Sequence, residues 1–250
     1  MRISHNHPRF ISLETRERLV RGFQSGVVVS QGLIAHGRGE AFDYLLGEVT
    51  PESSRVATKA AVALLLSAKN PIISVNGNTA ALVPRDIVRL ARLIPAGLEV
   101  NLFHRSLARE QRIASFLKRN GASQVLGANS SARIRIPGVA SPRRSVDAKG
   151  IGDADVVLVP LEDGDRAEAL RKTGKIVIAI DLNPMSRTSQ AATVTIVDNI
   201  IRVIPELVRM TLRMKPLSKS RLNAIASSFD NERNLARVMR DMIRYMQGWT

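Results

Sequence analysis

Cysteine is absent from this chain of 250 residues. Its absence excludes disulfides, thiolate nucleophiles and zinc sites with sulfur ligands, and it fits a reducing compartment. No apolar run approaches the roughly 20 residues that span a bilayer, and no apolar segment follows Met1 as in a signal peptide. We therefore expect a cytoplasmic protein with no membrane partner.

Aromatic residues are also scarce, at 4%, whereas 37 basic and 22 acidic residues give a net charge of +15. Such a surplus attracts anions, including nucleic acids. However, the charge is dispersed, and the aromatics are too few for the stacking platform of a single-strand binder. We expect the substrates to be anionic small molecules and expect no specific nucleic-acid partner. A basic nucleic-acid-binding protein is kept as an alternative, which predicts steeply salt-dependent binding.

Short β-rich runs alternate with helical stretches from Pro71 onward. Most of these runs are continuously apolar, which is typical of strands covered on both faces in a parallel sheet. The predicted strands are 71–75, 98–103, 124–126, 155–160, 176–181 and 193–197.

Capping signals place the helices between these strands. The triplet Thr50-Pro51-Glu52 predicts a capped helix to about Lys69, and Pro84 opens another. The remaining predicted helices are 106–120, 165–173, 199–214, 219–228 and 231–246. A polar loop is expected around 32–39 and a long loop at 127–152.

This alternation predicts an α/β fold, namely a Rossmann-like doubly wound, mainly parallel sheet with helical additions at both ends. The expected parts are a helical region at 1–70, an α/β core at 71–200 and C-terminal helices at 201–250, forming one compact unit.

Polar, glycine-punctuated segments follow the strands. Because ligands bind outside the carboxyl ends of parallel strands, we expect these segments to converge on one edge. Each also has a local explanation as a turn or a helix cap. The segments are 76–78, 101–105, 161–165, 181–188 and 198–199.

Residue chemistry suggests roles for some of these segments. A guanidinium beside a helix start, as at Arg187-Thr188, favours a phosphate. The acids Glu162, Asp163 and Asp165 could form only a turn and a cap, or could bind magnesium or an amine. Standard nucleotide and hydrolase motifs (G-x-G-x-x-G after a strand, G-x-x-x-x-G-K-[ST], G-x-S-x-G) are absent, so a bound nucleotide would need another arrangement.

Taken together, the segments resemble the archaeal phosphopantothenate synthetases, also called 4-phosphopantoate–β-alanine ligases. The resemblance covers nearly the whole chain and is weaker over the last fifty residues. It rests on 7–10 (HPRF), 32–44 (GLIAHGRGEAFDY), 74–78 (SVNGN), 99–105 (EVNLFHR), 159–166 (VPLEDGDR), 181–188 (DLNPMSRT) and 196–199 (IVDN).

The resemblance implies a homodimer that uses ATP to join 4-phosphopantoate to β-alanine, releasing AMP and pyrophosphate, in coenzyme A biosynthesis. It implies ATP contacts at Arg16, Arg38, Asp181, Leu182, Asn183, Arg187, Thr188, Asp198 and Asn199. A different phosphate-substrate α/β transferase on the same scaffold is the main alternative.

A mechanism that fits these residues forms a phosphopantoyl adenylate, which the amine of β-alanine then attacks. Catalysis would rest on positioning and positive charge rather than on a side-chain nucleophile. Arg38 and Arg187 are candidates for the triphosphate, and His104 and Arg105 for the substrate phosphate or carboxylate. Expected substrate contacts are His36, Asn76, Asn78 and Asn101. Glu162, Asp163 or Asp165 could hold Mg²⁺ or the ammonium group, and Asp163 is also counted as catalytic.

Overall fold

The computed structural model describes residues 4–7, 9–128, 132–161 and 163–248. Its centre is a sheet of five parallel strands in the order β2-β1-β5-β6-β7. This arrangement confirms the predicted Rossmann-like α/β class. The strands are β1 (Pro71–Val75), β2 (Gly97–Val100), β5 (Val156–Pro160), β6 (Ile176–Ile180) and β7 (Val194–Ile196).

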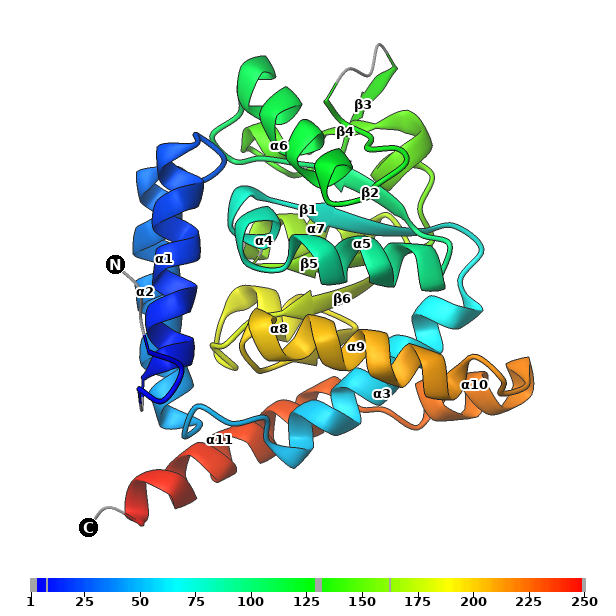
Figure 1. Ribbon diagram of the computed structural model, residues 1–250. Coiled ribbons are helices and arrows are strands. Elements are labelled where there is room, and N and C mark those ends of the chain that lie inside the picture. The colour runs from blue at the N-terminus through cyan, green and yellow to red at the C-terminus, as the bar shows by residue number, and fades with distance from the viewer. Residues whose placement is uncertain (1–3, 8, 129–131, 162, 249–250) are drawn as a thin grey trace.

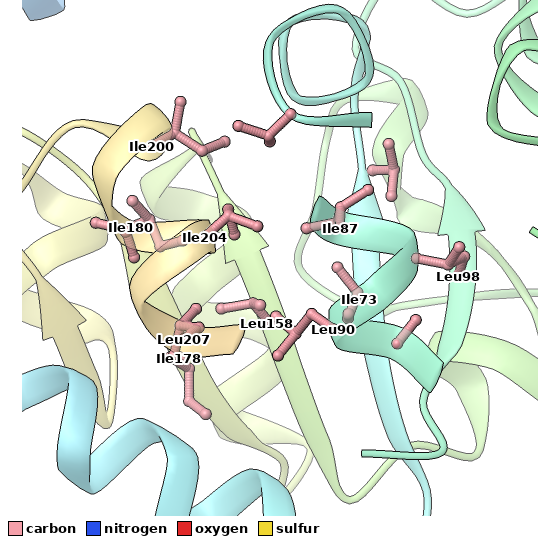
Figure 2. Packing of buried hydrophobic residues seen from close by; sticks show 14 of the residues in the cluster. Ile73, Ile87, Leu90, Leu98, Leu158, Ile178, Ile180, Ile200, Ile204 and Leu207 are labelled. Carbon is pink, nitrogen blue, oxygen red and sulfur yellow. The ribbon is translucent and has the colours of Figure 1, made fainter. Parts of the chain in front are cut away.

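Both faces of the sheet are buried, which explains why its strands read as continuous apolar runs. Alternate side chains point to opposite faces, so that Ile73 and Leu158 enter one core and Ile72 and Val157 enter the other. Figure 2 shows the first core, in which Ile73, Leu158 and Ile178 of the sheet face side chains of two helices.

Helices cover the two faces of the sheet (Figure 1). The first core is closed by α3 (Glu52–Ser67), α5 (Pro84–Leu93), α6 (Leu107–Arg119) and α9 (Ile200–Met214), and the second by α7 (Gly164–Lys172). The other helices are α1 (Phe10–Gln24), α2 (Ser30–Leu45), α4 (Gly77–Leu82), α8 (Arg187–Ala191), α10 (Lys219–Ser227) and α11 (Asn231–Gln247).

The N-terminal helices α1 and α2 stand beside the sheet at the end where α4 and α8 leave their strands (Figure 1). The loop predicted around 32–39 is wrong, because α2 is one continuous helix. Three glycines in eight residues suggested a loop, but Gly32 is required by packing. A Cβ there would lie 2.5 Å from Oδ1 of Asn78, so only glycine lets α2 approach α4 this closely.

The described part of the segment 127–152 contains more regular structure than predicted. It contains a small antiparallel pair, β3 (Arg133–Arg135) and β4 (Ser145–Asp147), a 3₁₀ turn η1 (Pro142–Arg144) and a wide turn η2 (Ala148–Gly152). We call residues 132–152 the β3–β4 module. The strand predicted at 124–126 is wrong, since Leu126 makes only an isolated bridge to Glu99.

Most predicted helix starts are confirmed by side-chain caps. Ser106, Ser186 and Asn199 each accept a backbone N–H from the first turn of the helix that follows them. Thr50 is one exception, because its hydroxyl donates to Oδ2 of Asp198 at 2.6 Å instead of capping α3. A tertiary hydrogen bond has taken the place of a local one. No helix among the described residues is long and apolar enough to cross a membrane.

Candidate active site

The sheet changes direction between β1 and β5, because the chain winds one way from β1 to β2 and the other way from β5 to β7. Such a switch point leaves a crevice outside the carboxyl ends of the two strands. A cavity of about 270 Å³ lies there. Its walls include Gln31, Gly32, His36, Asn76, Asn78, Phe103, His104, Arg109, Arg143, Leu161 and Asp163.

Asn76 joins the two strand ends that border this cavity. Its Oδ1 accepts the backbone N–H of Thr79 at 2.9 Å, which caps α4, and its Nδ2 donates to the carbonyl of Pro160 at 2.9 Å. Asn78 donates to the carbonyl of Gly32 at 2.8 Å, which fixes α2 against α4. The structure thus brings both predicted asparagines to the cavity, where their amides also hold its walls.

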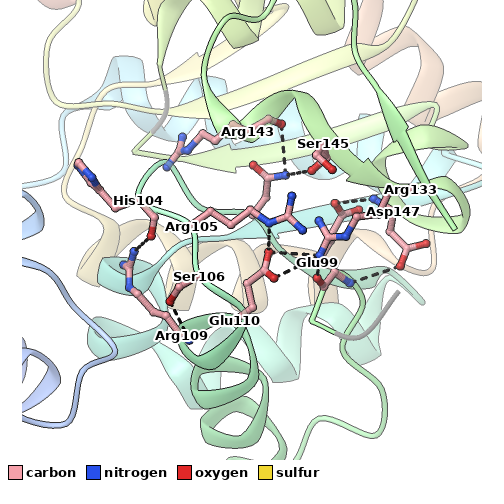
Figure 3. Close-up of polar contacts among 12 residues, drawn as sticks. Glu99, His104, Arg105, Ser106, Arg109, Glu110, Arg133, Arg143, Ser145 and Asp147 are labelled. Carbon is pink, nitrogen blue, oxygen red and sulfur yellow. Dashed lines mark hydrogen bonds and ion pairs between the residues drawn. The ribbon is translucent and has the colours of Figure 1, made fainter. Parts of the chain in front are cut away.

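Two arginines that were not predicted as site residues line the same cavity. Arg109 of α6 donates to the carbonyls of Val27 at 3.2 Å and His104 at 2.7 Å (Figure 3). Burial lowers the pKa of Arg109, and the positive charge of Arg143 lowers it further. Arg143 Nη1 lies 3.3 Å from Oδ2 of Asp163. Two guanidinium groups against one carboxylate make the cavity suited to an anion.

The β3–β4 module that carries Arg143 is held by two side chains of the second strand and its end. Asn101 donates from Nδ2 to the carbonyls of Arg143 at 3.4 Å and Ser145 at 3.2 Å (Figure 3). Glu99 accepts the backbone N–H groups of Asp147 at 3.1 Å and Ile151 at 2.6 Å. The predicted Asn101 therefore lies behind the cavity wall and positions Arg143.

Glu99 is a buried acid with a strongly shifted pKa. Burial raises its pKa to about 7, and the negative charge of Asp147 raises it too. The two backbone donors and the positive charge of Arg166 oppose this rise. The carboxyl group that anchors the β3–β4 module is thus easily protonated near neutrality.

His104 and Arg105, which were predicted as a pair, are separated by the structure. The His104 ring lines the cavity, whereas Arg105 donates from Nε to Oε1 of Glu110 at 2.8 Å. Glu110 is 1% exposed and also forms an ion pair with Arg133 at 3.2 Å. Arg133 therefore joins the β3–β4 module to α6 through Glu110, and Arg105 shares the same carboxylate, an arrangement that does not favour its predicted substrate contact.

Helix α2 connects the cavity with the ends of β6 and β7. Gly32 contacts Asn78 near its start, and a Cβ on Gly39 would lie 3.5 Å from Leu182 after β6. Near its end, Asp43 accepts a hydrogen bond from Asn199 after β7 at 2.8 Å. Arg38 is exposed on this helix and makes no hydrogen bond with the described residues, so its guanidinium is free to bind an anion.

The segment after β6 is folded around Asp181. This carboxylate accepts the backbone N–H of Asn183 at 2.9 Å and the hydroxyl of Ser186 at 2.5 Å. Burial raises the pKa of Asp181, while these two donors and the charge of Arg38 act in the opposite direction. Arg38 and residues 181–183 are thus close enough to interact, as their predicted common ligand requires.

Arg187 and Thr188 start α8 but differ in exposure. The Arg187 side chain is 70% exposed and donates to Oε1 of Glu168 on α7 at 2.9 Å. Thr188 is buried. Arg187 must therefore exchange an exposed carboxylate for a phosphate in order to act as predicted, which is a small cost for a surface ion pair.

The predicted residues after β7 belong to a buried network. Arg202 forms ion pairs with Asp43 and Asp198, and Asp198 also accepts hydrogen bonds from Thr50 and from the backbone of Asn199. Burial raises the pKa of Asp198 despite the opposing charge of Arg202. The side chains of Asp198 and Asn199 are thus occupied within the protein, and their contact with ATP stays a prediction.

The remaining predicted residues are Arg16, Asp165 and Glu162. Arg16 donates from Nε to Oε2 of Glu40 at 3.3 Å. Asp165 lies in the first turn of α7, and Glu162 falls outside the described residues. Within the described residues no three histidine or acidic side chains are grouped as a metal site.

Known proteins are similar to this chain over most of its length. A model of the phosphopantothenate/pantothenate synthetase family matches residues 53–245. A 4-phosphopantoate–β-alanine ligase of Methanosarcina mazei is 49% identical over 98% of this chain and 96% of its own length. Proteins of the same name from Thermococcus onnurineus and Methanospirillum hungatei are 49% and 53% identical, over 96% and 83% of this chain and 91% and 84% of their own lengths.

Proposed function

The chain belongs to the phosphopantothenate/pantothenate synthetase family, and from this premise we propose that it joins 4-phosphopantoate to β-alanine. The products are 4-phosphopantothenate, AMP and pyrophosphate, with ATP as the energy source, in coenzyme A biosynthesis. The observation that carries the proposal is similarity over 98% of the chain to a ligase of that name. The cavity at the switch point supports it, because its charges suit the reactants.

Arg109 and Arg143 bind the phosphate of 4-phosphopantoate in this proposal. Both guanidinium groups reach the cavity from rigid supports, α6 and the β3–β4 module. His104 lies beside them and contacts the same substrate. The carboxylate of Asp163, also in the cavity, receives the ammonium group of β-alanine. Opposite charges thus bring the two reactants to one crevice.

The nucleotide binds between α2 and the end of β6. Arg38 and Arg187 contact its phosphates, and residues 181–183 contact its nucleoside. Arg16 and Thr188 complete this site. Asp198 and Asn199 stabilise this site through the network with Arg202, and they contact the nucleotide through their backbone.

Magnesium would enter with the nucleotide. This ion keeps several waters and is usually held by substrate phosphates with one or two carboxylates, so a three-residue cage is not required. Among the described residues of the predicted acidic segment, Asp165 at the start of α7 is the acid left for it when Asp163 binds the ammonium group. The ion would neutralise charge on the phosphates.

The reaction proceeds through a phosphopantoyl adenylate. The substrate carboxylate attacks the α-phosphorus of ATP and pyrophosphate leaves, after which the amine replaces AMP. The residues named above hold the carboxylate and the α-phosphate in line and stabilise the charge on the phosphates.

A direct assay tests the proposal. The protein is incubated with 4-phosphopantoate, β-alanine and Mg-ATP, and the products are identified by mass. We expect 4-phosphopantothenate and AMP in equal amounts. Formation of ADP, or equal turnover of pantoate without its phosphate, would contradict the proposed reaction.

We also propose that the protein is a cytoplasmic homodimer. Large apolar side chains are exposed on the two N-terminal helices, with Ile11 at 67% and Ile34 at 72% exposure. Such side chains on neighbouring helices fit a surface shared by two copies. Sedimentation should show a dimer, and Ile34→Glu should weaken it. Cell fractionation should place the protein in the soluble cytoplasmic fraction.

A further inference from the structure

His36 and Glu40 lie one turn apart on α2, and the reaction described above gives them no chemical role. His36 is one of the residues that line the cavity, and its side chain is only 10% exposed. Its Nε2 atom is buried, has no hydrogen-bond partner among the described residues, and lies 3.9 Å from Oε1 of Glu40. A carboxylate on that side favours a proton on Nε2, which leaves Nδ1 as an acceptor.

Glu40 is itself held in place from α1. Its Oε2 accepts a hydrogen bond from Nε of Arg16, and its Oε1 accepts one from Ser12, both at 3.3 Å. An acid fixed by two donors and directed at the far nitrogen of a histidine is the arrangement that orients a general base. The pair needs only a small movement to close from 3.9 Å, as catalytic hydrogen bonds often do when a substrate binds.

Burial and a neighbouring cation favour the neutral form of His36. Burial lowers its pKa most, and Arg16 of α1 lowers it further, while Glu40 and Asp43 of α2 raise it. Across the cavity, Arg109 and Arg143 face it together with Asp163 and His104. A neutral imidazole can accept a proton at neutral pH, whereas an imidazolium could not.

We propose that His36 is the general base of the amide-forming step, with Glu40 as the residue that positions it. This inference rests on the proposed function. It concerns only the second half of that reaction, because the carboxylate that attacks ATP is already ionised and needs no base. The ammonium group of β-alanine, by contrast, must lose two protons to become an amide nitrogen.

The protons and electrons of this step balance as follows. The ammonium group first releases one proton to solvent, and the amine then forms the C–N bond to the acyl carbon of the adenylate. As this adduct collapses, the C–O bond to AMP breaks and AMP leaves with the electron pair. The second proton passes from the nitrogen to Nδ1 of His36 and then to solvent.

Two half-reactions measured on His36→Gln test the role. We expect exchange of labelled pyrophosphate into ATP, which depends on 4-phosphopantoate alone, to stay within about threefold of the unmodified protein. Ligation of β-alanine should fall about 100-fold, the usual contribution of a general base. Hydroxylamine is a much weaker base than the amine of β-alanine, so its adduct loses the proton to water without a base, and it should react with the adenylate almost as fast in both proteins. His7→Gln, an exposed histidine outside the cavity, is the matched control.

The pH dependence separates a base from a merely structural residue. With β-alanine, kcat/KM of the unmodified protein should fall at acid pH as His36 is protonated, and His36→Gln should lack this decline. Glu40→Gln removes a charge that raises the pKa of His36, so the decline should move to lower pH and the plateau should drop about tenfold. This variant tests the pair even if His36→Gln does not fold.

The outcomes distinguish the two proposals. An unmodified protein that forms no AMP overturns the proposed function and the role of His36 with it. An active unmodified protein overturns only the role of His36 if His36→Gln ligates β-alanine normally. Equal losses with β-alanine and hydroxylamine would do the same.

Discussion

The two ends of α2 lie beside charged residues of similar types, which border a cavity at one end and form a buried network at the other. Near its start, arginines and an acid surround a cavity of about 270 Å³, and Arg109, Arg143 and Asp163 all line it. Near its end, Asp43 and Arg202 are joined with Asp198 and Asn199 in a network whose charges are paired within the protein. Clusters of charged residues therefore mark a binding site where they border a cavity, and not where they are enclosed in a buried network.

The largest expected effect is at the cavity near the start of α2. Arg143→Ala should lower kcat/KM for 4-phosphopantoate about 1000-fold, because a charge-stabilising donor is lost from a buried site. The preference for 4-phosphopantoate over pantoate should decline with it. Arg144→Ala, at the exposed neighbouring position, is the control and should change kcat/KM little. Equal effects of the two substitutions would argue against a specific phosphate contact.

In the charge-paired network near the end of α2 we expect loss of stability instead. Arg202→Ala leaves the carboxylates of Asp43 and Asp198 without their cation and should lower the free energy of unfolding by about 3 kcal/mol in urea titrations. Arg209→Ala on the same helix removes only an exposed pair with Glu206 and should cost less than about 1 kcal/mol. The comparison between the two ends would fail if Arg202→Ala kept its stability but lost ATP turnover.

Arg38 lies between the two ends of α2 and tests how far the ligand-binding region extends along this helix. Arg38→Ala should lower kcat/KM for ATP about 100-fold, since its guanidinium has no partner among the described residues and is free for phosphate. Arg38→Lys keeps the charge and should recover part of the loss. Unchanged kinetics in folded Arg38→Ala would confine the site to the cavity near Asn78.

The smallest expected effect concerns Glu99, which anchors the β3–β4 module through two backbone N–H groups. Its pKa is raised from an ordinary 4.5 to about 7 in the folded protein. The folded state therefore binds this proton more tightly, so the stabilisation is complete below pH 4.5 and is lost as the pH rises through 7. Between pH 5 and 8 the free energy of unfolding should fall by about 2 kcal/mol from this group. Glu99→Gln should flatten that decline, and an unchanged slope would contradict the shifted pKa.

Much of the sheet could be predicted from the sequence. The runs at 71–75, 155–160 and 176–181 match β1, β5 and β6 within one residue, because a strand buried on both faces must be apolar throughout. The 124–126 run failed because β propensity alone does not show whether a partner strand is available for more than one bridge.

The site was harder to predict than the sheet. Asn76, Asn78 and His104 lie at the cavity as the strand-end rule predicts. Arg109 and Arg143 could not be found in this way, since one lies inside a helix and the other in a segment that looked like a long loop. Their role depends on tertiary folding that brings α6 and the β3–β4 module to one crevice. Conversely, Arg105 follows a strand, but its guanidinium forms an ion pair with Glu110.

The straightness of α2 has a consequence for the size of the substrate. Gly32 touches Asn78 beside the cavity, and Gly39 approaches Leu182 beside the proposed nucleotide site. Seven residues of α-helix rise about 10 Å, a length that side-chain rearrangement cannot alter. One element of secondary structure therefore fixes the spacing between the two reactants. An acid much shorter or longer than 4-phosphopantoate could place its phosphate or its carboxylate correctly, but not both.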